Sequence, residues 1–404
     1  MVPDSMRVRL HLRRVRVLEV LVDVPERLEV RVADTRPVVR CPHCGHKTAR
    51  VHDRRTKQIR DLPVSGRPVV LHWLRRRFVC DSCGERFLED HPEFEGDVTR
   101  RLARQLVRDA KAMSIREVAR RHRLSWHYIM GLVAAWATLV VAHRRRQRCR
   151  VLLVDETSLR RGHRYVTVVE DGETGAVLGM VRHRDERALS SFFVEQGRRW
   201  CRQVEVVVSD GSKSYKAAIE KHLGHATHVL DRFHVVRWFA VGLIEVRRRI
   251  QRREPRGKVK PAFVPEIFRA RFILLARADH LDDHRRDRLE QLLARHPELD
   301  AAWRMLQELH GLYLTDDLAG FDAALERFAD LYDQHGLPEF YEVVNTLIAW
   351  FPEIRAYHQH ERVSNGRLEG TNNKLGVLKR IGYGFTNASN FGHRGALICP
   401  PLAS

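Results

Sequence analysis

The stretch that decides the fold is VLLVDETSL, Val151 to Leu159, in which four apolar residues are followed by two acids. A short run of Val and Leu predicts a buried strand, and the acids mark its end. A charge in that position costs free energy unless it has a partner or binds a metal. A second apolar run, VEVVVS, ends in the same way at Asp210. Asp155 and Asp210 are therefore candidate functional residues, and a turn or cap role for each is the simpler alternative.

The residues around these strands alternate between strand and helix patterns. RYVTVVEDGETGAVLGMVRH (164–183) predicts two strands around a turn, and ERALSSFFVEQGRRW (186–200) predicts a helix. A short strand follows in ATHVLDRFHVV, and the pattern is helical from residue 236 to about 357. Acids at strand ends of an open α/β sheet can converge on one crevice. Two aspartates and a glutamate could there hold two Mg²⁺ or Mn²⁺ ions about 3.5–4 Å apart, as phosphoryl transfer on DNA requires.

A third acid lies in SNGRLEGTNNKLGVLKRIGYG (364–384), which reads as a helix with an apolar stripe. Its first half carries one carboxylate, Glu369, among amide, glycine and basic residues. Glu369 is the candidate third ligand, and a solvated surface glutamate is the alternative. Basic neighbours of a scissile bond contact phosphates. The candidate phosphate contacts here, with solvation as the alternative, are Arg367, Lys374 and Lys379.

Two CxxC pairs predict a structural zinc site near the N-terminus. CPHCG and CDSCG each place two thiolates on a tight turn, and Zn²⁺ takes four such ligands in a tetrahedron. The segment between the pairs is longer than in most zinc ribbons, and a hairpin around Ser65–Gly66 could fill it. The expected ligands are Cys41, Cys44, Cys80 and Cys83, with His43, His46 and His52 as substitutes, and two unrelated buried pairs are the alternative.

The remaining cysteines and the hairpin have simpler predicted roles. Cys149, Cys201 and Cys399 fit no metal pattern and are predicted to be small apolar core residues. The predicted hairpin carries three consecutive arginines that could lie on DNA phosphates. They are Arg75, Arg76 and Arg77.

SIREVARRHRLSWHYIMGLV (114–133) fits a helix-turn-helix, although any helical hairpin gives similar spacing. Ser125 would cap the second helix. That helix would present its first side chains to a DNA groove, with arginines near phosphates. The groove candidates are Trp126, His127 and Tyr128, and the phosphate candidates are Arg120, Arg121 and Arg123.

Composition favours a DNA-binding protein of a reducing compartment. The chain of 404 residues has 72 Lys and Arg against 51 Asp and Glu, a formal net charge of +21. Such an excess indicates a polyanionic partner, and double-stranded DNA is the first candidate. No apolar run reaches the roughly 18–20 residues that span a bilayer. The longest, IMGLVAAWATLVVA (129–142), is predicted to be a buried helix. No membrane association and no secretory signal are expected, and the predicted location is the cytoplasm, associated with the nucleoid.

The motifs VDETS, VVVSDGSKSY, LDRFHVVR and SNGRLEGTNNKLGVLKRIGYGF, in this order, resemble those of the DDE transposases of bacterial insertion sequences. The closest resemblance is to the group with an N-terminal cysteine zinc module and a helix-turn-helix. The resemblance implies an RNase H-like core interrupted by a helical insertion, with Asp155, Asp210 and Glu369 as catalytic metal ligands. Asp231 and His234 match a family element near the site and are expected to support it, with packing as the alternative.

The predicted fold class is multidomain α+β, and the predicted function is DNA transposition. The protein would bind the terminal inverted repeats of its element, cleave DNA in a metal-dependent reaction and transfer the strand to target DNA. Pairing of two ends implies a homodimer or a higher oligomer. The expected parts are a zinc-binding β module (1–92), a helix-turn-helix (93–145), the first part of the core (146–235), the helical insertion (236–360) and the last core helix with the tail (361–404).

Two other functions remain open on the sequence. One is a non-catalytic DNA-binding regulator, including an inactive transposase remnant, and the other is an RNase H-like nuclease that performs no strand transfer. The tail FGHRGALICPPLAS after Asn390 lacks the basic, helical continuation that the resemblance leads us to expect. A truncated or frameshifted C-terminal end is therefore an expectation.

Overall fold

We describe the protein from a computed structural model. The described residues are 10–160, 162, 164–253, 265–315, 317–360 and 363–399. Residues 1–9, 254–264 and 400–404, with a few further positions, lie outside them. The chain divides into two compact units, Met1–Trp136 and Ala137–Ser404, and each is described by itself. The finer domain boundaries given above stay predictions.

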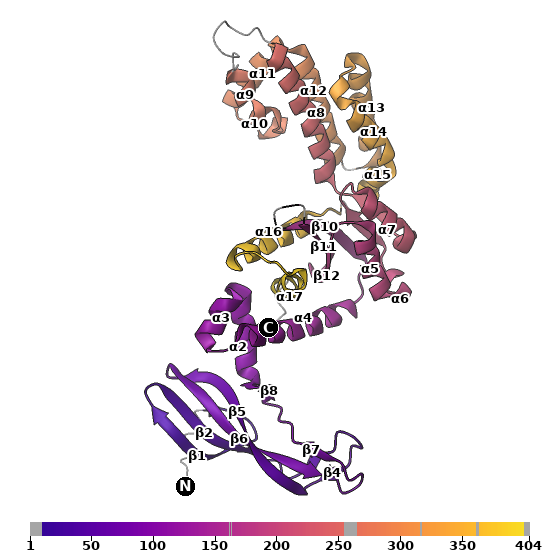
Figure 1. The fold of residues 1–404 in the computed structure, drawn as a ribbon. Coiled ribbons are helices and arrows are strands. Elements are labelled where there is room, and N and C mark those ends of the chain that lie inside the picture. The colour runs from indigo at the N-terminus through magenta and orange to yellow at the C-terminus, as the bar shows by residue number, and fades with distance from the viewer. Residues whose placement is uncertain are drawn as a thin grey trace. The chain divides into compact units, whose positions relative to one another are not determined.

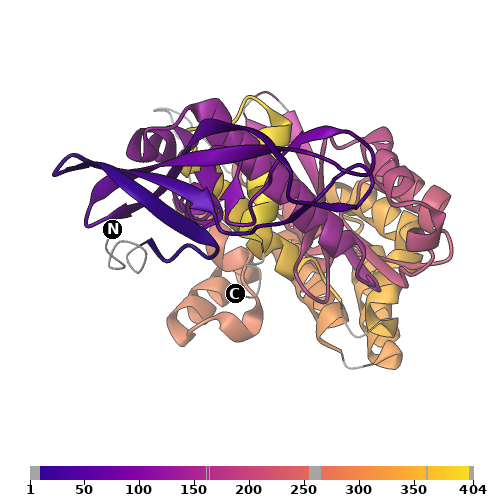
Figure 2. The same cartoon turned by 90° about the horizontal axis from the view of Figure 1, so that it is seen from below.

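The first unit is built on a seven-stranded sheet with the order β1-β2-β6-β5-β9-β8, in which β7 also pairs with β6. Its apolar core includes Leu28, Val30, Val32, Ile59 and Leu71. Figure 1 and Figure 2 show this sheet in two views. The strands are β1 (Val15–Val24), β2 (Arg27–Asp34), β5 (Val51–Val64), β6 (Arg67–Val79), β7 (Arg86–Leu88), β8 (Phe94–Glu95) and β9 (Val98–Thr99), with β3 (Val39–Arg40) and β4 (Lys47–Thr48) in a separate pair.

The predicted hairpin around Ser65–Gly66 is confirmed. Strands β5 and β6 pair in antiparallel fashion with Val64 opposite Arg67. Ser65 and Gly66 both have positive φ, 51° and 78°, as a two-residue turn of the type that matches strand twist requires. The hairpin joins the two cysteine pairs, one of which precedes β5 while the other follows β6.

Three helices complete the first unit and lead into the second: α2 (Arg100–Ala112), α3 (Ile115–His122) and α4 (Trp126–Arg145). Ser114 caps α3 by accepting from Glu117 N, and Arg123 takes the left-handed conformation that ends it. Ser125 Oγ accepts from Tyr128 N at the start of α4, as predicted. This is a helix–turn–helix connection in the geometric sense, and whether it binds DNA stays a prediction.

Helix α4 is only partly buried, so the prediction of a buried helix is wrong for much of its length. It is the one helix among the described residues that is long and apolar enough to cross a membrane, by length and composition alone. Only 28% of its apolar window is buried. Ile129, Val133 and Ala137 are buried, whereas Leu139 is 70% exposed. Amphipathic burial of this kind is typical of a helix that packs along one face.

The second unit contains a five-stranded sheet with the order β12-β11-β10-β13-β14. Strand β11 pairs in antiparallel fashion with both β10 and β12, while β13 runs parallel to β10 and β14 parallel to β13. All five strands were predicted from the sequence. They are β10 (Val151–Arg160), β11 (Arg164–Asp171), β12 (Val177–Arg182), β13 (Val206–Ser209) and β14 (Thr227–Leu230).

Apolar residues on both faces bury this sheet. Leu152 and Val154 belong to a cluster with residues of α5 and α7, whereas Leu153 belongs to one with residues of α16 and α17. Because neighbouring residues of a strand point to opposite faces, the uninterrupted apolar run in β10 is explained by helices on both sides. The covering helices, labelled in Figure 1, are α5 (Glu186–Gln196), α6 (Arg198–Cys201), α7 (Lys213–Leu223), α16 (Gly366–Ile381) and α17 (Ala388–Ile398).

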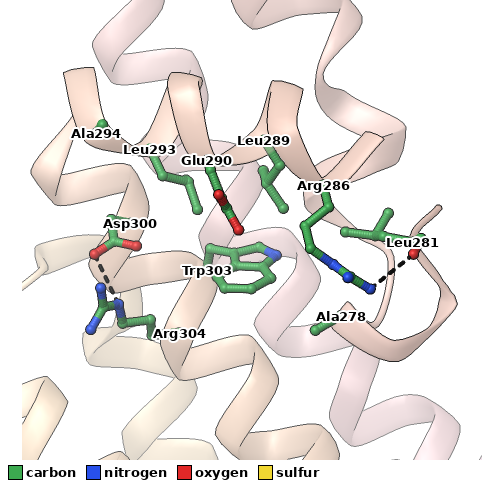
Figure 3. A pocket seen from close by; sticks show the side chains of 10 residues that line it. All are labelled: Ala278, Leu281, Arg286, Leu289, Glu290, Leu293, Ala294, Asp300, Trp303 and Arg304. Atoms are coloured by element: carbon green, nitrogen blue, oxygen red, sulfur yellow. Dashed lines mark hydrogen bonds and ion pairs between the residues drawn. The ribbon is translucent and has the colours of Figure 1, made fainter. Parts of the chain in front are cut away.

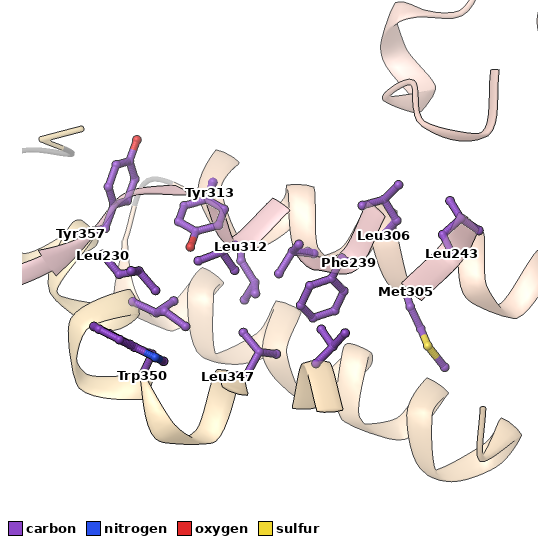
Figure 4. Packing of buried hydrophobic residues seen from close by; sticks show 14 of the residues in the cluster. Leu230, Phe239, Leu243, Met305, Leu306, Leu312, Tyr313, Leu347, Trp350 and Tyr357 are labelled. Atoms are coloured by element: carbon purple, nitrogen blue, oxygen red, sulfur yellow. The ribbon is translucent and has the colours of Figure 1, made fainter. Parts of the chain in front are cut away.

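A helical block lies between β14 and α16 in the sequence, as predicted. Its apolar residues continue the core of the sheet, and Figure 4 shows Leu230 of β14 in the same cluster as Phe239, Leu347 and Trp350. The block consists of α8 (Arg232–Arg253), α9 (Pro265–Arg269), α10 (Arg271–Leu274), η1 (Ala278–His280), α11 (Asp283–Arg295), α12 (Pro297–Leu314), α13 (Leu318–His335), η2 (Pro338–Phe340), α14 (Tyr341–Ala349) and α15 (Phe351–Gln359).

The chain after Asn390 is helical, so the expectation that the helical continuation is lost is wrong. Helix α17 includes Phe391 and Leu397, which are buried, and it packs near β12. Arg394 is also buried. Cys149, Cys201 and Cys399 are buried, as predicted for apolar core residues.

Candidate active site

Two of the predicted acids come together at one end of the sheet. Asp155 lies on β10, and Asp210 directly follows β13, the parallel neighbour of β10. His234, in the first turn of α8, completes a group whose ligand atoms all lie within 4.8 Å of one another. Leu153 lies opposite Val208 in this parallel pair, and the same register continued by two residues brings Asp155 level with Asp210.

The carboxylates of this cluster are held in a dry environment. Burial raises the pKa of Asp155 to about 6. Burial also raises the pKa of Asp210, to about 7, and the adjacent Glu156 carboxylate adds to the increase. Both shifts mean that the ionised form has too few cations and hydrogen-bond donors nearby. The arrangement therefore favours either a bound proton or a bound metal ion.

His234 is oriented by a buried acid. Its Nδ1 lies 3.3 Å from Asp231 Oδ2, and Asp231 Oδ1 accepts from Asn365 N at 3.0 Å. Burial would lower the pKa of His234, but the hydrogen bond to Asp231 and the carboxylates of Asp210 and Asp155 outweigh it and raise the pKa. With Nδ1 engaged, Nε2 is the nitrogen left for a metal or a phosphate.

Helix α16 packs against the carboxylate end of β10 through two asparagines. Asn365 Nδ2 donates to Val154 O at 3.2 Å, and Asn372 Nδ2 donates to Asp155 Oδ2 at 2.8 Å. Asn365 precedes the first residue of the helix but does not cap it with its side chain, because that side chain is used on β10. Residues separated by three or four positions share a helix face, so Glu369 lies on the face that carries Asn365 and Asn372.

Glu369 is exposed and is not part of the cluster formed by Asp155, Asp210 and His234. The structure therefore brings Glu369 to the correct helix face but leaves its carboxylate outside the group of converging ligand atoms. A change of its side-chain rotamer is the movement that could bring the carboxylate closer, since the backbone of α16 is already fixed by the two asparagines.

Glu156 and Gly211 are site residues that the sequence reasoning missed. Glu156 interacts with Asp210 and also accepts from Arg184 at 3.2 Å. A Cβ on Gly211 would lie 2.4 Å from Cζ2 of Trp238, so the backbone beside Asp210 can approach this ring only as glycine. The motif VDETS places Glu156 directly after Asp155, and this adjacency is the signal by which the sequence could have identified it.

The three predicted phosphate contacts of α16 have different environments. Arg367 Nη1 donates to the carbonyl oxygens of Gly172 and Glu173. Lys379 Nζ donates to Ser158 O on β10 and lies 3.5 Å from Thr157 Oγ1, and burial lowers its pKa. Lys374 is exposed.

The four predicted zinc ligands come together in the first unit. The Sγ atoms of Cys41 and Cys83 are 3.7 Å apart, those of Cys44 and Cys80 are 3.5 Å apart, and all four lie within 4.8 Å of one another. Each pair sits on a turn closed by a left-handed glycine, Gly45 or Gly84. The backbone of Cys83 donates to the Cys80 thiol and lowers its pKa to about 6, which favours the thiolate that zinc requires. The substitutes His43, His46 and His52 are exposed and lie outside the group.

The arginines of β6 are engaged within the protein. Arg75 Nε donates to Glu89 O, and Arg76 forms an ion pair of 2.7 Å with Glu89, whose side chain is fully buried. Arg77 pairs with Asp53. Their guanidinium groups therefore already have anionic or carbonyl partners, and DNA contact by them would need those partners to be exchanged or shared.

The predicted groove residues lie at the start of α4 and are more accessible. Trp126 is 41% exposed, and His127 is exposed. Tyr128 is half-buried, with its hydroxyl near Glu95 O. Of the predicted phosphate contacts, Arg120 pairs with Glu117, and Arg121 and Arg123 are exposed.

A separate pocket lies within the helical block. Figure 3 shows Trp303 at its centre, with Leu289, Glu290 and Arg286 from α11 along one side. None of its lining residues belongs to the carboxylate cluster. It is therefore not part of the candidate active site.

Comparisons with known proteins give one consistent result. A family model for DDE transposases of the ISL3 type matches residues 152–394. A second, for the zinc-finger of the transposases of IS204, IS1001, IS1096 and IS1165, matches residues 37–83. The chain is 29% identical over 367 residues to the transposase for insertion sequence element IS1001 of Bordetella parapertussis, covering 90% of this chain and 89% of that protein. It is 28% identical over 295 residues to the transposase for IS1557 of Mycobacterium tuberculosis, covering 68% and 66%.

Proposed function

Because the chain belongs to the ISL3 family of DDE transposases, we propose that Asp155, Asp210 and Glu369 form the active site with which it cuts DNA at the ends of an insertion sequence and joins the freed 3′ ends to target DNA. The observation that carries this proposal is the convergence of Asp155, Asp210 and His234 within 4.8 Å. Their segments are far apart in the sequence, and only the fold brings them together.

The strand order supports an RNase H-like core. Three antiparallel strands followed by two parallel ones, with the acids on β10 and at the end of β13, give the arrangement expected of that fold. The helical block then enters between β14 and α16. We therefore assign the block as an insertion into the core, with α16 as the core helix that carries the third acid.

The residues present fit a hard divalent cation. Two carboxylates with raised pKa values supply oxygen ligands, and His234 supplies one nitrogen. The amide oxygens of Asn365 and Asn372 are buried without a hydrogen-bond partner among the described residues. Oxygen-rich sites of this kind suit Mg²⁺ or Mn²⁺. Two such ions, when bound, would supply activation of the attacking oxygen and stabilisation of the leaving oxygen.

The protein's own groups then have distinct tasks. Asp155 and Asp210 would hold the cations, and Glu369 would join them if its side chain turned toward the cluster. Asn372 fixes the Asp155 carboxylate, and Asp231 fixes the His234 ring. Exposed Lys374 and partly buried Lys379 lie on the same helix and are proposed to hold the DNA phosphates on either side of the site.

The first unit is proposed to recognise the ends of the element. Its four-cysteine zinc ribbon lies at the open end of the β5–β6 hairpin, and structural Zn²⁺ would keep that end ordered. The turn between α3 and α4 presents Trp126 and His127 with Arg120, Arg121 and Arg123, which suits groove and phosphate contacts. Two element ends must be held at once, so we propose a homodimer or higher oligomer that acts on chromosomal DNA in the cytoplasm.

The experiment is cleavage of a labelled duplex that carries the element's own end, with Mg²⁺, Mn²⁺ or EDTA. We expect cutting at the end in either metal and none in EDTA. Asp155→Ala, Asp210→Ala and Glu369→Ala should each reduce cutting by more than about 100-fold while DNA binding in a gel-shift assay is retained. Glu173→Ala, which changes an exposed acid in the turn after β11, is the matched control.

Four results would count against the proposal. Metal-independent cutting would contradict the metal centre, and cutting without preference for the element end would favour a nuclease. Tight, specific binding with no cutting in any metal would favour a DNA-binding regulator. Wild-type cutting by one of the three acid variants would remove that residue from the active site.

A further inference from the structure

Phe233 is an aromatic residue that stands in solvent directly beside the carboxylate cluster. It is 57% exposed. Its ring centroid lies 6.0 Å from that of His234, with the two rings nearly perpendicular. It is the second residue of α8, and His234, the next residue, shares the cluster with Asp155 and Asp210. Single exposed apolar side chains are common, so the location of this ring, and not its exposure alone, calls for an explanation.

Positive charge flanks the ring on the same helix. Arg237 is exposed and lies four residues after Phe233, so the two side chains share a helix face. Arg232, immediately before Phe233, is also exposed. Proteins that hold unpaired nucleotides combine these two features, because bases stack on aromatic rings while cations follow the phosphates.

Residues on the opposite side of α8 are packed into the core, so the helix cannot rotate to bury the ring of Phe233. Val235 and Phe239 are fully buried in the core of the unit. Trp238 packs against the backbone of Gly211, beside Asp210. These contacts fix the rotation of α8, and Phe233 is therefore held on the outer face next to the cluster.

We propose that Phe233 stacks on the nucleobase adjacent to the phosphate that is cut, and that Arg237 pairs with a neighbouring phosphate. The ligand is thus one unpaired nucleotide at the element end. Every base has a π face, so the stack tolerates any base. Taking a base out of the duplex costs free energy, and the stack on Phe233 offsets part of that cost. The inference rests on the proposed function, because it places the cut phosphate at the cluster.

The first test measures binding and requires no cleavage. The fluorescent base 2-aminopurine is placed in turn at each nucleotide around the terminus of the element end, in Ca²⁺ in place of Mg²⁺. With the wild-type protein, one position should brighten several-fold, as a base does on leaving the duplex stack. Phe233→Ala should abolish that change, and Phe233→Trp should retain displacement of the base while quenching its fluorescence. Equal signals for wild type and Phe233→Ala at every position would overturn the proposal.

The second test measures cleavage and asks whether the effect of Phe233 on the cleavage rate depends on the presence of the base. On the intact end, Phe233→Ala should cut about tenfold or more slowly, as expected for one lost base–aromatic stack. On an end that lacks the base at the responsive position, wild type and Phe233→Ala should cut at equal rates. Equal slowing of Phe233→Ala on both ends would mean that Phe233 acts only through packing, and would overturn the proposal.

Phe272→Ala is the matched control. Phe272 is 73% exposed and lies on α10 of the helical block, outside the cluster. It should match wild type in both tests and in thermal stability. A wild-type protein that cuts nowhere but shows the Phe233-dependent fluorescence change would count against the proposed function alone, so the two failures are distinguishable.

Discussion

At the scale of single residues, the candidate site contains carboxyl groups that the fold keeps away from water, although their ionised form prefers to be solvated. Asp155 lies within β10 and Asp210 directly follows β13, and burial raises the pKa of each, to about 6 and about 7. A protein gains no stability from carboxylates in such a position. In the proposed function, the cation that they bind accounts for their presence, since strongly shifted pKa values are common at functional sites.

Glu170 is a buried carboxyl that the proposed reaction does not use. It lies on β11, is fully buried, and both of its carboxyl oxygens lack a hydrogen-bond partner among the residues that the structure describes. Burial raises its pKa from 4.5 to about 7, although Arg367 and Lys374 act in the opposite direction. The folded protein therefore binds this proton more tightly than the unfolded chain does.

Glu170→Gln tests this pH linkage. Below about pH 4.5 the carboxyl is protonated in both states and lowers stability little. Between about pH 4.5 and 7 the unfolded chain ionises first, so the stability of the wild type falls relative to the variant as the pH rises. Above about pH 7 the difference levels off at roughly 3 kcal/mol in favour of the variant. Denaturant unfolding at pH 5 and pH 8 measures it, and a difference that is equal at both pH values would contradict the shifted pKa.

At the scale of elements, helix α16 connects Glu369, the third candidate acid, to the strand that carries Asp155. Asn365 and Asn372 attach it to Val154 and Asp155 of β10, and Leu368 and Leu375 bury its inner face. The helix thereby places Glu369 on the helix face that contacts β10, although the helical block separates the two elements in the sequence. Its amide-rich sequence is explained by these contacts with β10 and not by surface solvation.

Asn372→Ala tests the role of this connection. The variant loses the donor that orients Asp155 Oδ2, so the Mg²⁺ concentration needed for half-maximal cleavage should rise by about 10-fold or more, as for other residues that orient metal ligands. DNA binding should not change. Asn373→Ala is the matched control, because Asn373 is the exposed neighbour on the same helix. If both variants have the same metal requirement, the contact with Asp155 has no role in metal binding.

The sequence allowed the elements to be predicted where the signal is local. The apolar runs that end at Asp155 and Asp210, the Ser65–Gly66 turn and the two CxxC turns each depend on neighbouring residues, and all of them are present. The inclusion of His234 in the cluster depends on the packing of α8 against the ends of β10 and β13. The contact of Asn372 with Asp155 joins residues 217 positions apart. No pattern in either segment encodes such pairings.

Two errors have the same origin. Helix α4 was predicted to be buried because its composition is apolar, but burial depends on what packs against each face, and Leu139 has nothing over most of its surface. The segment after Asn390 was not expected to be helical. It forms α17, in which the buried residues Phe391, Arg394 and Gly395 stand at positions i, i+3 and i+4 of one helix face.

At the scale of the whole molecule, the two units have separate cores. The cysteine site packs with Phe78 and Phe87 in a small cluster of the first unit, whereas the acids depend on the apolar clusters of the second unit. In the proposed function, DNA recognition belongs to the first unit and DNA cleavage to the second, and the two units can lose stability independently.

Removal of zinc tests this independence. The double variant Cys41→Ser with Cys44→Ser should fail to retain Zn²⁺ and should lose the unfolding transition of the zinc ribbon, because a structural zinc supplies much of the folding free energy of such a small module. Specific binding of the element end should weaken strongly. The unfolding transition of the second unit, followed by calorimetry of the full chain, should not move. A parallel loss of both transitions would show that the two units do not fold independently.

The central claim is that residues 155, 210 and 369 form one metal centre, and Glu369 is its least constrained member. The most direct measurement is the cleavage rate of Glu369→Cys on the element end in Mg²⁺ and in Mn²⁺. Magnesium binds thiolates poorly, while manganese accepts them better. The account predicts a loss of more than about 100-fold in Mg²⁺ and a substantial recovery in Mn²⁺, with no recovery for Glu369→Ala. Cleavage by Glu369→Cys at the wild-type rate in Mg²⁺, or no difference between the Cys and Ala variants in Mn²⁺, would contradict it.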